Sequence, residues 1–193
     1  MNRRVAIIGG GLAGAEAAWQ LAILGVPSCI FEMRPKVKTA AHKTPHLAEL
    51  VCSNSFRSDD DEYNAVGQLH WEMRKSNGLI ISVGDKTRLP AGSAMAVDRE
   101  KFSSKVSEMI KINPLIQVIN EEVLDLKLLD FKNVILATGP LTSSNLLTSI
   151  VELTDSENLF FYDAIAPTVY ADSIDFEKSW FQSRYDKGAT KEE

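Results

Sequence analysis

Apolar residues come in short runs along this chain, and the first runs predict a strand–turn–helix–strand unit. Val5 to Ile8 are all apolar, glycines follow them, and residues 12–24 carry apolar side chains at helical spacing. Gly25 stands where a glycine commonly ends a helix, and residues 28–32 predict the next strand. Because these strands do not alternate between apolar and polar positions, we expect them to be buried in a parallel sheet.

The remaining pattern predicts helices that alternate with short strands. Helices are expected over residues 63–75, 98–112 and 141–153, the second of them with Asp98 as its N-cap. Strands are expected over residues 79–83, 116–120, 123–128, 133–137 and 159–162, and a turn over residues 90–95. Residues 33–61 have weak periodicity and predict a long loop, which in a compact domain is usually functional or mobile.

This order of elements predicts the α/β fold class, with a Rossmann-like domain built on a parallel sheet. We assign to it residues 1–165, including the long loop 33–61 and an inserted region at 76–115. Residues 166–193 are expected to begin a truncated second region, so we expect the fold to be incomplete at the end of this chain.

Composition narrows the class of protein. The 193 residues are 45% hydrophobic and 24% charged, which suits one globular domain with a buried core. Asp and Glu outnumber Lys and Arg by 26 to 21, and the net charge of −5 excludes a generic polybasic nucleic-acid binder, although not a local basic patch. No apolar run reaches the roughly 18–20 residues of a membrane span, and no signal peptide is expected. Two cysteines are too few for a disulfide framework, so we expect a cytoplasmic protein.

A glycine-rich motif lies between the first strand and the first helix. Its six residues are Gly9, Gly10, Gly11, Leu12, Ala13 and Gly14, which match G-x-G-x-x-G. In that motif the first glycine permits a tight turn, the second lets a pyrophosphate approach, and the third lets helix and strand pack closely. Glu32 lies 21 residues after Gly11, at the end of the second strand, where an acid accepts from ribose hydroxyls and favours FAD or NAD over NADP. The alternative is a glycine-rich turn that binds nothing.

Two further sites each allow a functional interpretation and a purely structural one. Thr138 and Gly139 follow the apolar strand 133–137, where they could approach a dinucleotide or form an ordinary strand-to-helix turn. Cys52 lies in the long loop with polar neighbours and Arg57 five residues on, which suits a nucleophilic thiolate. Its alternative is a small inert residue, which also describes Cys29.

We expect no metal site. His42 and His46 are four residues apart, but Pro45 lies between them and the segment is not helical in pattern. His70 falls in a predicted amphipathic helix and is expected at its surface or boundary.

Several stretches together resemble one family. They are residues 5–22, Glu32-Met33-Arg34-Pro35, Ala48 to Ser55 with Cys-Ser-Asn-Ser, Pro90 to Arg99, Ala137 to Ser143, Phe161 to Pro167 and Ser183 to Gly188. The chain resembles the folate- and FAD-dependent tRNA uracil-5-methyltransferases, relatives of the glucose-inhibited division protein A flavoproteins, over nearly its whole length. The glycine motif is common to many flavoproteins, whereas the cysteine motif and Glu-Met-Arg-Pro are much more specific.

The resemblance implies a reaction. It implies transfer of a one-carbon unit from methylenetetrahydrofolate to C5 of a T-loop uridine in tRNA, with FAD as cofactor and NAD(P)H as reductant. It implies that Cys52 is the reactive cysteine, that Gly9 to Gly14 and Glu32 bind FAD, and that Thr138 and Gly139 form a second FAD contact. Addition of a thiolate to C6 of uracil would make C5 nucleophilic, which agrees with this assignment.

Two alternatives stay open. Members of the family are much longer, so we expect that the rest of an inserted domain and a second functional cysteine are missing here. The chain would then be a non-catalytic FAD-binding fragment, either truncated or paired with a separate C-terminal chain. The other alternative is an FAD oxidoreductase of small molecules. The oligomeric state is left open.

Overall fold

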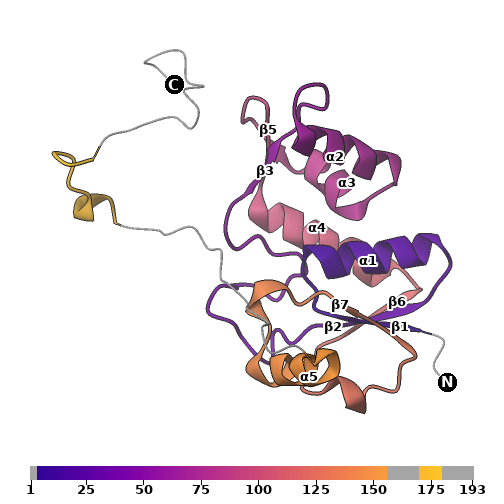
Figure 1. The fold of residues 1–193 in the computed structure, drawn as a ribbon. Coiled ribbons are helices and arrows are strands. Elements are labelled where there is room, and N and C mark those ends of the chain that lie inside the picture. Colours follow the sequence, from indigo (N-terminus) through magenta and orange to yellow (C-terminus); the bar gives the residue numbers. More distant parts are fainter. Residues whose placement is uncertain (1–3, 156–169, 180–193) are drawn as a thin grey trace.

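The computed structural model describes residues 4–155 and 170–179, and its centre is a parallel sheet (Figure 1). Its strands are β1 (Val5–Ile8), β2 (Ser28–Phe31), β6 (Ile116–Ile119) and β7 (Asn133–Leu136). They lie in the order β6-β2-β1-β7, and every neighbouring pair is parallel. By order along the chain this is 3-2-1-4, the strand order of a Rossmann fold. The predicted α/β class with a parallel sheet is therefore confirmed.

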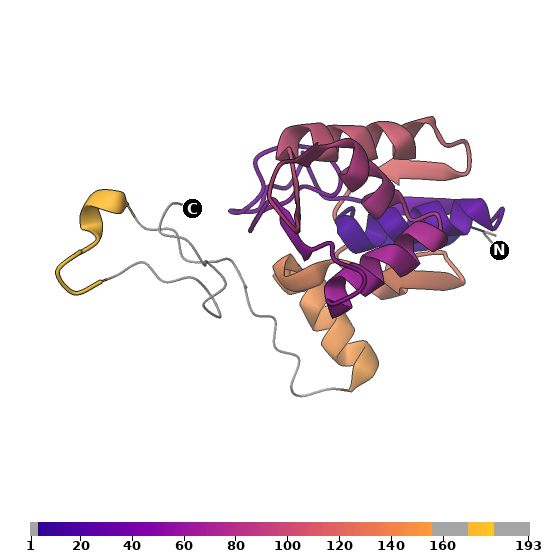
Figure 2. The ribbon, with the colours of Figure 1, turned by 90° about the horizontal axis from the view of Figure 1, so that it is seen from above.

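Helices cover both faces of this sheet (Figures 1 and 2). Helices α1 (Leu12–Ile23) and α4 (Arg99–Ile112) lie on one face, and α5 (Ser144–Thr154) lies on the other. The side chain of Ile7 belongs to the core under α1 and α4, whereas Ile8 packs with Leu146 of α5. Successive residues of a strand point to opposite faces, so a strand covered on both sides must be apolar throughout, as β1 is.

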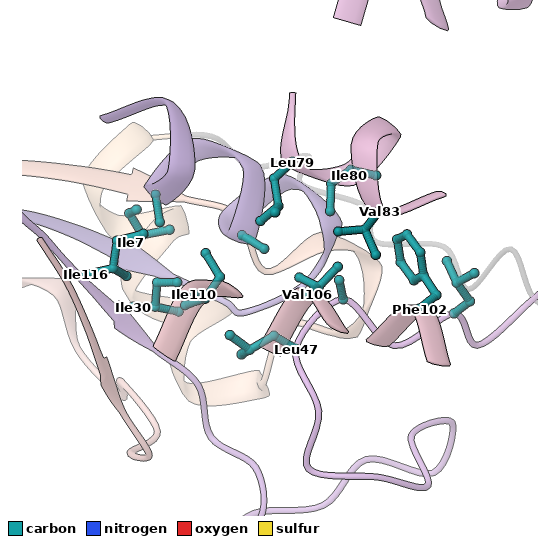
Figure 3. Close-up of a cluster of buried hydrophobic side chains, with 14 of the residues drawn as sticks. Ile7, Ile30, Leu47, Leu79, Ile80, Val83, Phe102, Val106, Ile110 and Ile116 are labelled. Carbon is teal, nitrogen blue, oxygen red and sulfur yellow. The ribbon is translucent and has the colours of Figure 1, made fainter. Parts of the chain in front are cut away.

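The larger core lies between the sheet and α4 (Figure 3). Phe102, Val106 and Ile110 are fully buried, and their spacing of four residues places them on one face of α4. The side chain of Asp98 accepts a hydrogen bond from the backbone N–H of Lys101 at 3.1 Å. The predicted helix with its predicted N-cap is therefore confirmed.

A smaller unit is inserted between β2 and α4. It consists of β3 (Ser55–Ser58), α2 (Ala65–Lys75), α3 (Leu79–Lys86), β4 (Arg88–Leu89) and β5 (Ala94–Val97). The three strands form an antiparallel sheet in the order β3-β5-β4. The carboxylate of Asp59 joins these elements, because it accepts hydrogen bonds from Arg74 and Arg88 at 2.7–3.0 Å and lies 2.9 Å from Nδ1 of His70. His70 is buried, rather than at a helix surface or boundary as predicted.

We expect Asp59→Asn to lower the free energy of unfolding by about 2 kcal/mol at neutral pH, because charged hydrogen bonds are lost. Burial raises the pKa of Asp59, but its bonds to His70, Arg74 and Arg88 outweigh this and hold the pKa below its ordinary value of 3.8. A lowered folded-state pKa stabilises the fold above 3.8, and the contribution disappears as the pH falls through the folded value. Urea unfolding should show the difference between the two proteins shrinking below pH 3.8; a difference independent of pH would contradict this.

Several predicted elements are wrong. Residues 79–83, predicted as a strand, form α3, whose first turn is capped by Glu16: its carboxylate accepts from the N–H groups of Leu79 and Ile80 at 3.1 and 2.8 Å. An apolar run of this length does not distinguish a strand from a buried helix. Residues 123–128 form a loop and a 3-10 turn, because the Asp125 carboxylate accepts from the backbone of Lys127. The predicted turn 90–95 contains the start of strand β5. The predicted loop 33–61 contains the whole of strand β3.

Other boundaries differ little from the prediction. Helix α2 begins at Ala65 with Asn64 as its cap, and α5 begins at Ser144. The predicted strand 159–162 lies outside the described residues. Within residues 4–155 and 170–179, no helix is both long enough and apolar enough to span a bilayer.

Candidate functional site

A cleft opens at the carboxyl ends of the parallel strands, at the point where the strand order reverses between β1 and β7. It encloses about 570 Å³, part of it open to solvent. Its walls are Ile8, Gly9, Gly10, Gly11, Phe31, Glu32, Met33, Arg34, His42, Glu121, Glu122, Val123, Ala137, Thr138, Leu141, Thr142, Ser143 and Leu146. Open α/β sheets bind their ligands at this position.

The glycines of the turn serve separate purposes. Gly9 has φ +103°, and a Cβ on it would lie 2.6 Å from the carbonyl oxygen of Ala137. A Cβ on Gly14 would lie 1.9 Å from the carbonyl oxygen of Gly9, so only glycine lets α1 start this close to β1. The Cβ position on Gly11 has no atom within 4 Å, so this backbone is open to the cleft. Leu12 packs against the core, and Ala13 is exposed in the first turn of α1.

Glu32 lies buried at the end of β2 and is joined directly to the glycine turn. Its Oε2 accepts from the backbone N–H of Gly10 at 2.9 Å, and its Oε1 accepts from the backbone N and the Nε of Arg34 at 3.0 and 2.8 Å. Burial raises the pKa of Glu32, but the bonds from Arg34 and Gly10 outweigh it, so the pKa lies below its ordinary value and the group is ionised. A carboxylate has about four acceptor positions, so Glu32 retains capacity for one hydroxyl donor.

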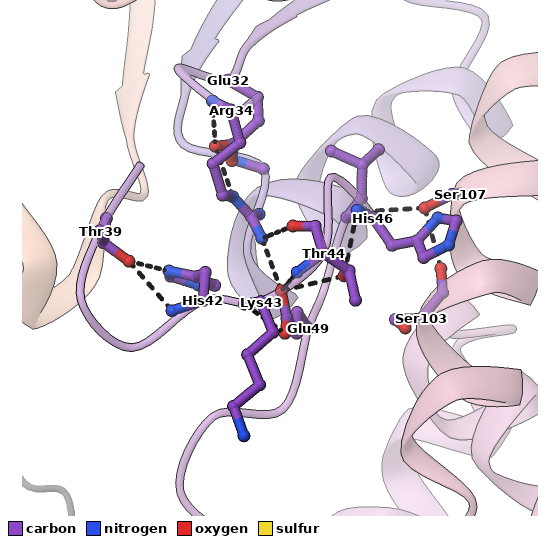
Figure 4. A network of polar contacts seen from close by, with 12 residues as sticks. Glu32, Arg34, Thr39, His42, Lys43, Thr44, His46, Glu49, Ser103 and Ser107 are labelled. Carbon is purple, nitrogen blue, oxygen red and sulfur yellow. Dashed lines mark hydrogen bonds and ion pairs between the residues drawn. The ribbon is translucent and has the colours of Figure 1, made fainter. Parts of the chain in front are cut away.

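The same arginine continues the network away from the cleft (Figure 4). Nη1 of Arg34 donates to Glu49 Oε2 at 3.1 Å and to the carbonyl oxygen of Thr44 at 3.2 Å. Glu49 also accepts from the backbone N–H groups of Lys43 and Thr44 at 2.9 and 3.1 Å. Although burial raises the pKa of Glu49, these bonds lower it below its ordinary value. Two carboxylates thus share one buried guanidinium.

The residues just before Glu49 are bonded to the glycine turn and to α4. The backbone N–H of Ala48 donates to the carbonyl oxygen of Gly10 at 2.8 Å, and the N–H of Leu47 donates to Ser107 Oγ of α4 at 2.8 Å. Cys52 itself is exposed, and its carbonyl oxygen accepts from Nη2 of Arg99 at 3.5 Å. Cys52 is not among the described residues that line the cleft.

Thr138 and Gly139 follow β7 on the far side of the same cleft. Thr138 lines the cleft, and its Oγ1 lies 2.5 Å from that of Thr142. Gly139 has φ +64° and starts a 3-10 turn that leads to α5, with no atom within 4 Å of its Cβ position. The structure therefore brings Gly9, Gly10, Gly11, Glu32 and Thr138 to one cleft, with Gly14 beneath the turn.

Sequence reasoning missed three residues of this site, namely Arg34, His42 and Glu49. Arg34 and Glu49 stand inside the two stretches quoted for their specificity, but nothing in their spacing indicated an ion pair. His42 lines the cleft, with Nδ1 at 2.6 Å from Thr39 Oγ1. Burial, and then the charge of Arg34, lower the pKa of His42, so its ring is neutral at neutral pH. Among the residues that the structure describes, no group of three or more His, Cys, Asp or Glu could hold a metal ion.

Similarity to known proteins extends over almost the whole chain. The family model of glucose inhibited division protein A matches residues 4–192. A methylenetetrahydrofolate–tRNA-(uracil-5-)-methyltransferase TrmFO of Cereibacter sphaeroides strain ATCC 17023 is 58% identical over 100% of this chain, and one of Ruegeria sp. strain TM1040 is 57% identical. This chain spans 43% of the length of each of these relatives.

A solved structure resembles the fold. The structure of Aquifex aeolicus GidA superposes with a TM-score of 0.56 at 18% identity, over 71% of this chain and 25% of that one. At this identity the likeness concerns the fold alone.

Proposed function

Because the chain belongs to the glucose inhibited division protein A family, we propose that it binds FAD in the cleft and takes part in folate-dependent methylation of C5 of a T-loop uridine in tRNA. The single observation that carries the cofactor is the glycine turn, where the open backbone of Gly11 starts α1 at the switch point of the sheet. The N-terminus of a helix presents free N–H groups and a partial positive charge to a pyrophosphate. The ionised Glu32, with one acceptor position left, suits a ribose hydroxyl.

The shape of the cleft supports a dinucleotide over a smaller anion. The cleft runs from Glu32 and His42 at the end of β2, past Gly11, to Thr138 after β7. In this proposal Glu32 holds the adenosine ribose, the turn from Gly9 to Gly14 holds the pyrophosphate, and Thr138 and Gly139 form the second contact. The buried carboxylate of Glu32 would repel a phosphate group on that ribose, which favours FAD over NADP, whose adenosine ribose carries a 2′-phosphate.

Cys52 is proposed as the nucleophile toward the uracil ring. Its thiolate adds to C6, so that C5 gains the electron density needed to attack the one-carbon unit of methylenetetrahydrofolate. After C5 loses its proton, the thiolate leaves again and the ring regains its double bond. When bound, reduced FAD would supply the two electrons, as a hydride equivalent, that replace the bond between the transferred carbon and the folate nitrogen. Tetrahydrofolate then leaves and a methyl group remains on C5, and NAD(P)H is the proposed reductant of FAD. The proposed partner is tRNA, and the proposed compartment is the cytoplasm.

A second candidate is an FAD-binding part that works only with another chain or segment. The observation that favours it is the edge of the sheet: Val134 and Leu136 of β7 are 38% and 42% exposed. Apolar side chains on an edge strand commonly lie against a further element.

We expect the purified chain, incubated with FAD and desalted, to retain about one flavin per chain by visible absorption. With methylenetetrahydrofolate, NADH or NADPH and a tRNA transcript, it is expected to methylate a T-loop uridine. Cys52→Ala should retain the flavin and reduce methyl transfer to the level without enzyme, because the nucleophile is removed while the cleft is untouched. Cys29→Ala, at the other and buried cysteine, is the matched control and should leave transfer unchanged.

The other outcomes separate the candidates. Flavin binding without methyl transfer in the wild-type chain would favour the second candidate. A colourless chain would contradict the proposed cofactor. Turnover of a small substrate that Cys52→Ala leaves intact would instead indicate an oxidoreductase.

A further inference from the structure

A buried arginine joins the segment between β2 and β3 to the cleft. The side chain of Arg34 is 4% exposed. It contacts Glu32, at the end of β2, and Glu49, which lies fifteen residues after Arg34 in the sequence. Both carboxylates are nearly buried, at 7% and 12% exposure of their side chains. One guanidinium therefore bridges the cleft and the segment that leads to Cys52.

Glu49 organises its own side of this bridge. Its oxygens accept from the backbone of Lys43 and from both the backbone N–H and the hydroxyl of Thr44, at 2.9–3.1 Å. These bonds fix the turn between 43 and 49, and Cys52 follows three residues later. A change in the position of Glu49 would therefore move the backbone on which Cys52 is carried.

The peptide groups of Gly10 bond both to Glu32 and to the segment that leads to Cys52. Glu32 accepts from the N–H of Gly10, while the carbonyl oxygen of Gly10 accepts from the N–H of Ala48. The peptide groups of the turn are thus held on one side by the ribose-binding carboxylate and on the other by the Cys52 segment. A cofactor that orders the glycine turn would therefore order both Glu32 and the segment that leads to Cys52.

We propose that Arg34 and Glu49 are positioning residues that couple cofactor binding in the cleft to the position of Cys52. This inference rests on the proposed binding of FAD. FAD at Glu32 and the glycine turn favours the arrangement in which Arg34 holds Glu49, and this arrangement fixes the Cys52 segment. Coupling between two sites is reciprocal, so weakening the contact between Arg34 and Glu49 weakens FAD binding as well.

The test uses Glu49→Gln, which keeps the size of the side chain but removes its charge. We expect the dissociation constant for FAD, measured by flavin fluorescence, to rise about 10-fold, within the usual range of such couplings. The second readout is the alkylation rate of Cys52 by iodoacetamide, followed by peptide mass spectrometry with buried Cys29 as internal reference. In the wild type FAD should slow this alkylation several-fold, and in Glu49→Gln the ratio of the rates without and with saturating FAD should approach one.

Two further variants keep the test decisive. Glu152→Gln removes a carboxylate from an exposed ion pair with Lys127 and should leave both readouts unchanged. Thr44→Val removes the hydroxyl bond to Glu49 and the bond that this hydroxyl accepts from the backbone N–H of His46 at 3.3 Å, but keeps the charge of Glu49. It should shift both readouts in the same direction by less, which covers the case that Glu49→Gln does not fold. A merely structural role would alter the alkylation rate equally with and without FAD, and would leave the ratio at its wild-type value.

The outcomes separate this inference from the proposed function. FAD affinity and an alkylation ratio that remain at wild-type values in Glu49→Gln and Thr44→Val would overturn the coupling alone. A wild-type chain that binds no FAD would overturn the proposed cofactor and this inference with it.

Discussion

Gly14→Ala is expected to lower the free energy of unfolding by about 3 kcal/mol, because forcing atoms into a packed region moves the backbone. The new Cβ would lie 1.9 Å from the carbonyl oxygen of Gly9 and 3.3 Å from the side chain of Ile7. Backbone cannot rotate away as a flexible side chain can, so α1 must shift from β1. For a chain of this size the midpoint of thermal unfolding should fall by roughly 6–12 °C.

Gly11→Ala is the matched comparison on the same turn. The Cβ would meet no atom within 4 Å, and Gly11 has an extended backbone with φ −72° at the N-cap of α1. Alanine is less favourable than glycine at an N-cap, so a cost of about 0.5–1 kcal/mol is expected here, well below that of Gly14→Ala. The methyl group would nevertheless occupy the space proposed for the pyrophosphate, so FAD binding should weaken while the midpoint of thermal unfolding falls by much less than in Gly14→Ala. Equal melting temperatures for Gly14→Ala and Gly11→Ala would contradict the packing role of Gly14.

The cleft was predictable from sequence because its chemistry is local. A turn that needs glycine at Gly9, an open helix start at Gly11 and an acid at the end of the next strand are spaced by the fold itself, so the motif reports the geometry. The same holds for Asp98, since a cap acts on the N–H groups that follow it directly.

Features that depend on distant partners were not predictable. Residues 79–83 are apolar apart from Ser82, and the first turn of their helix is capped by the carboxylate of Glu16 on α1, 63 residues away from Leu79. His70 is buried because Asp59, at the end of β3, lies against its ring. Neither contact has a signature in the local pattern, because hydrophobic periodicity records which face is buried and not which polar group covers it.

The network around Arg34 explains why the long loop after β2 is ordered without helices. Its backbone N–H groups at 43 and 44 are satisfied by Glu49, and the carbonyl oxygen of Arg34 accepts from Asn120 Nδ2 at 2.6 Å. A loop this close to the core must satisfy its backbone polar groups, and here side chains do so. The specific stretches Glu-Met-Arg-Pro and Ala-Glu-Leu-Val-Cys-Ser-Asn-Ser therefore contribute to one structural feature.

Arg34→Met is the second large effect, with an expected loss of about 3–5 kcal/mol of unfolding free energy at neutral pH. Methionine fills much of the space but leaves the carboxylates of Glu32 and Glu49 buried without their cation. Part of the loss should be regained in Arg34→Met combined with Glu49→Gln, because one of the two buried charges is then removed.

The pH dependence of this loss distinguishes charge from packing. In the wild type the pKa values of Glu32 and Glu49 lie below the ordinary 4.5, so the stabilisation is complete above 4.5 and declines as the pH falls further. Without Arg34, Glu32 loses the side-chain hydrogen bond and the charge that oppose its burial, whereas Glu49 keeps its bonds from Lys43 and Thr44. We therefore expect the pKa of Glu32 to rise in the variant, so that acid stabilises the variant by protonating this carboxylate. The gap in urea unfolding between wild type and Arg34→Met should therefore be widest at neutral pH and should narrow as the pH approaches 4.5. A gap that stays constant over this range would mean that the arginine acts through the packing of its aliphatic stem, and the ionic bridge would then contribute nothing to the stability of the cleft.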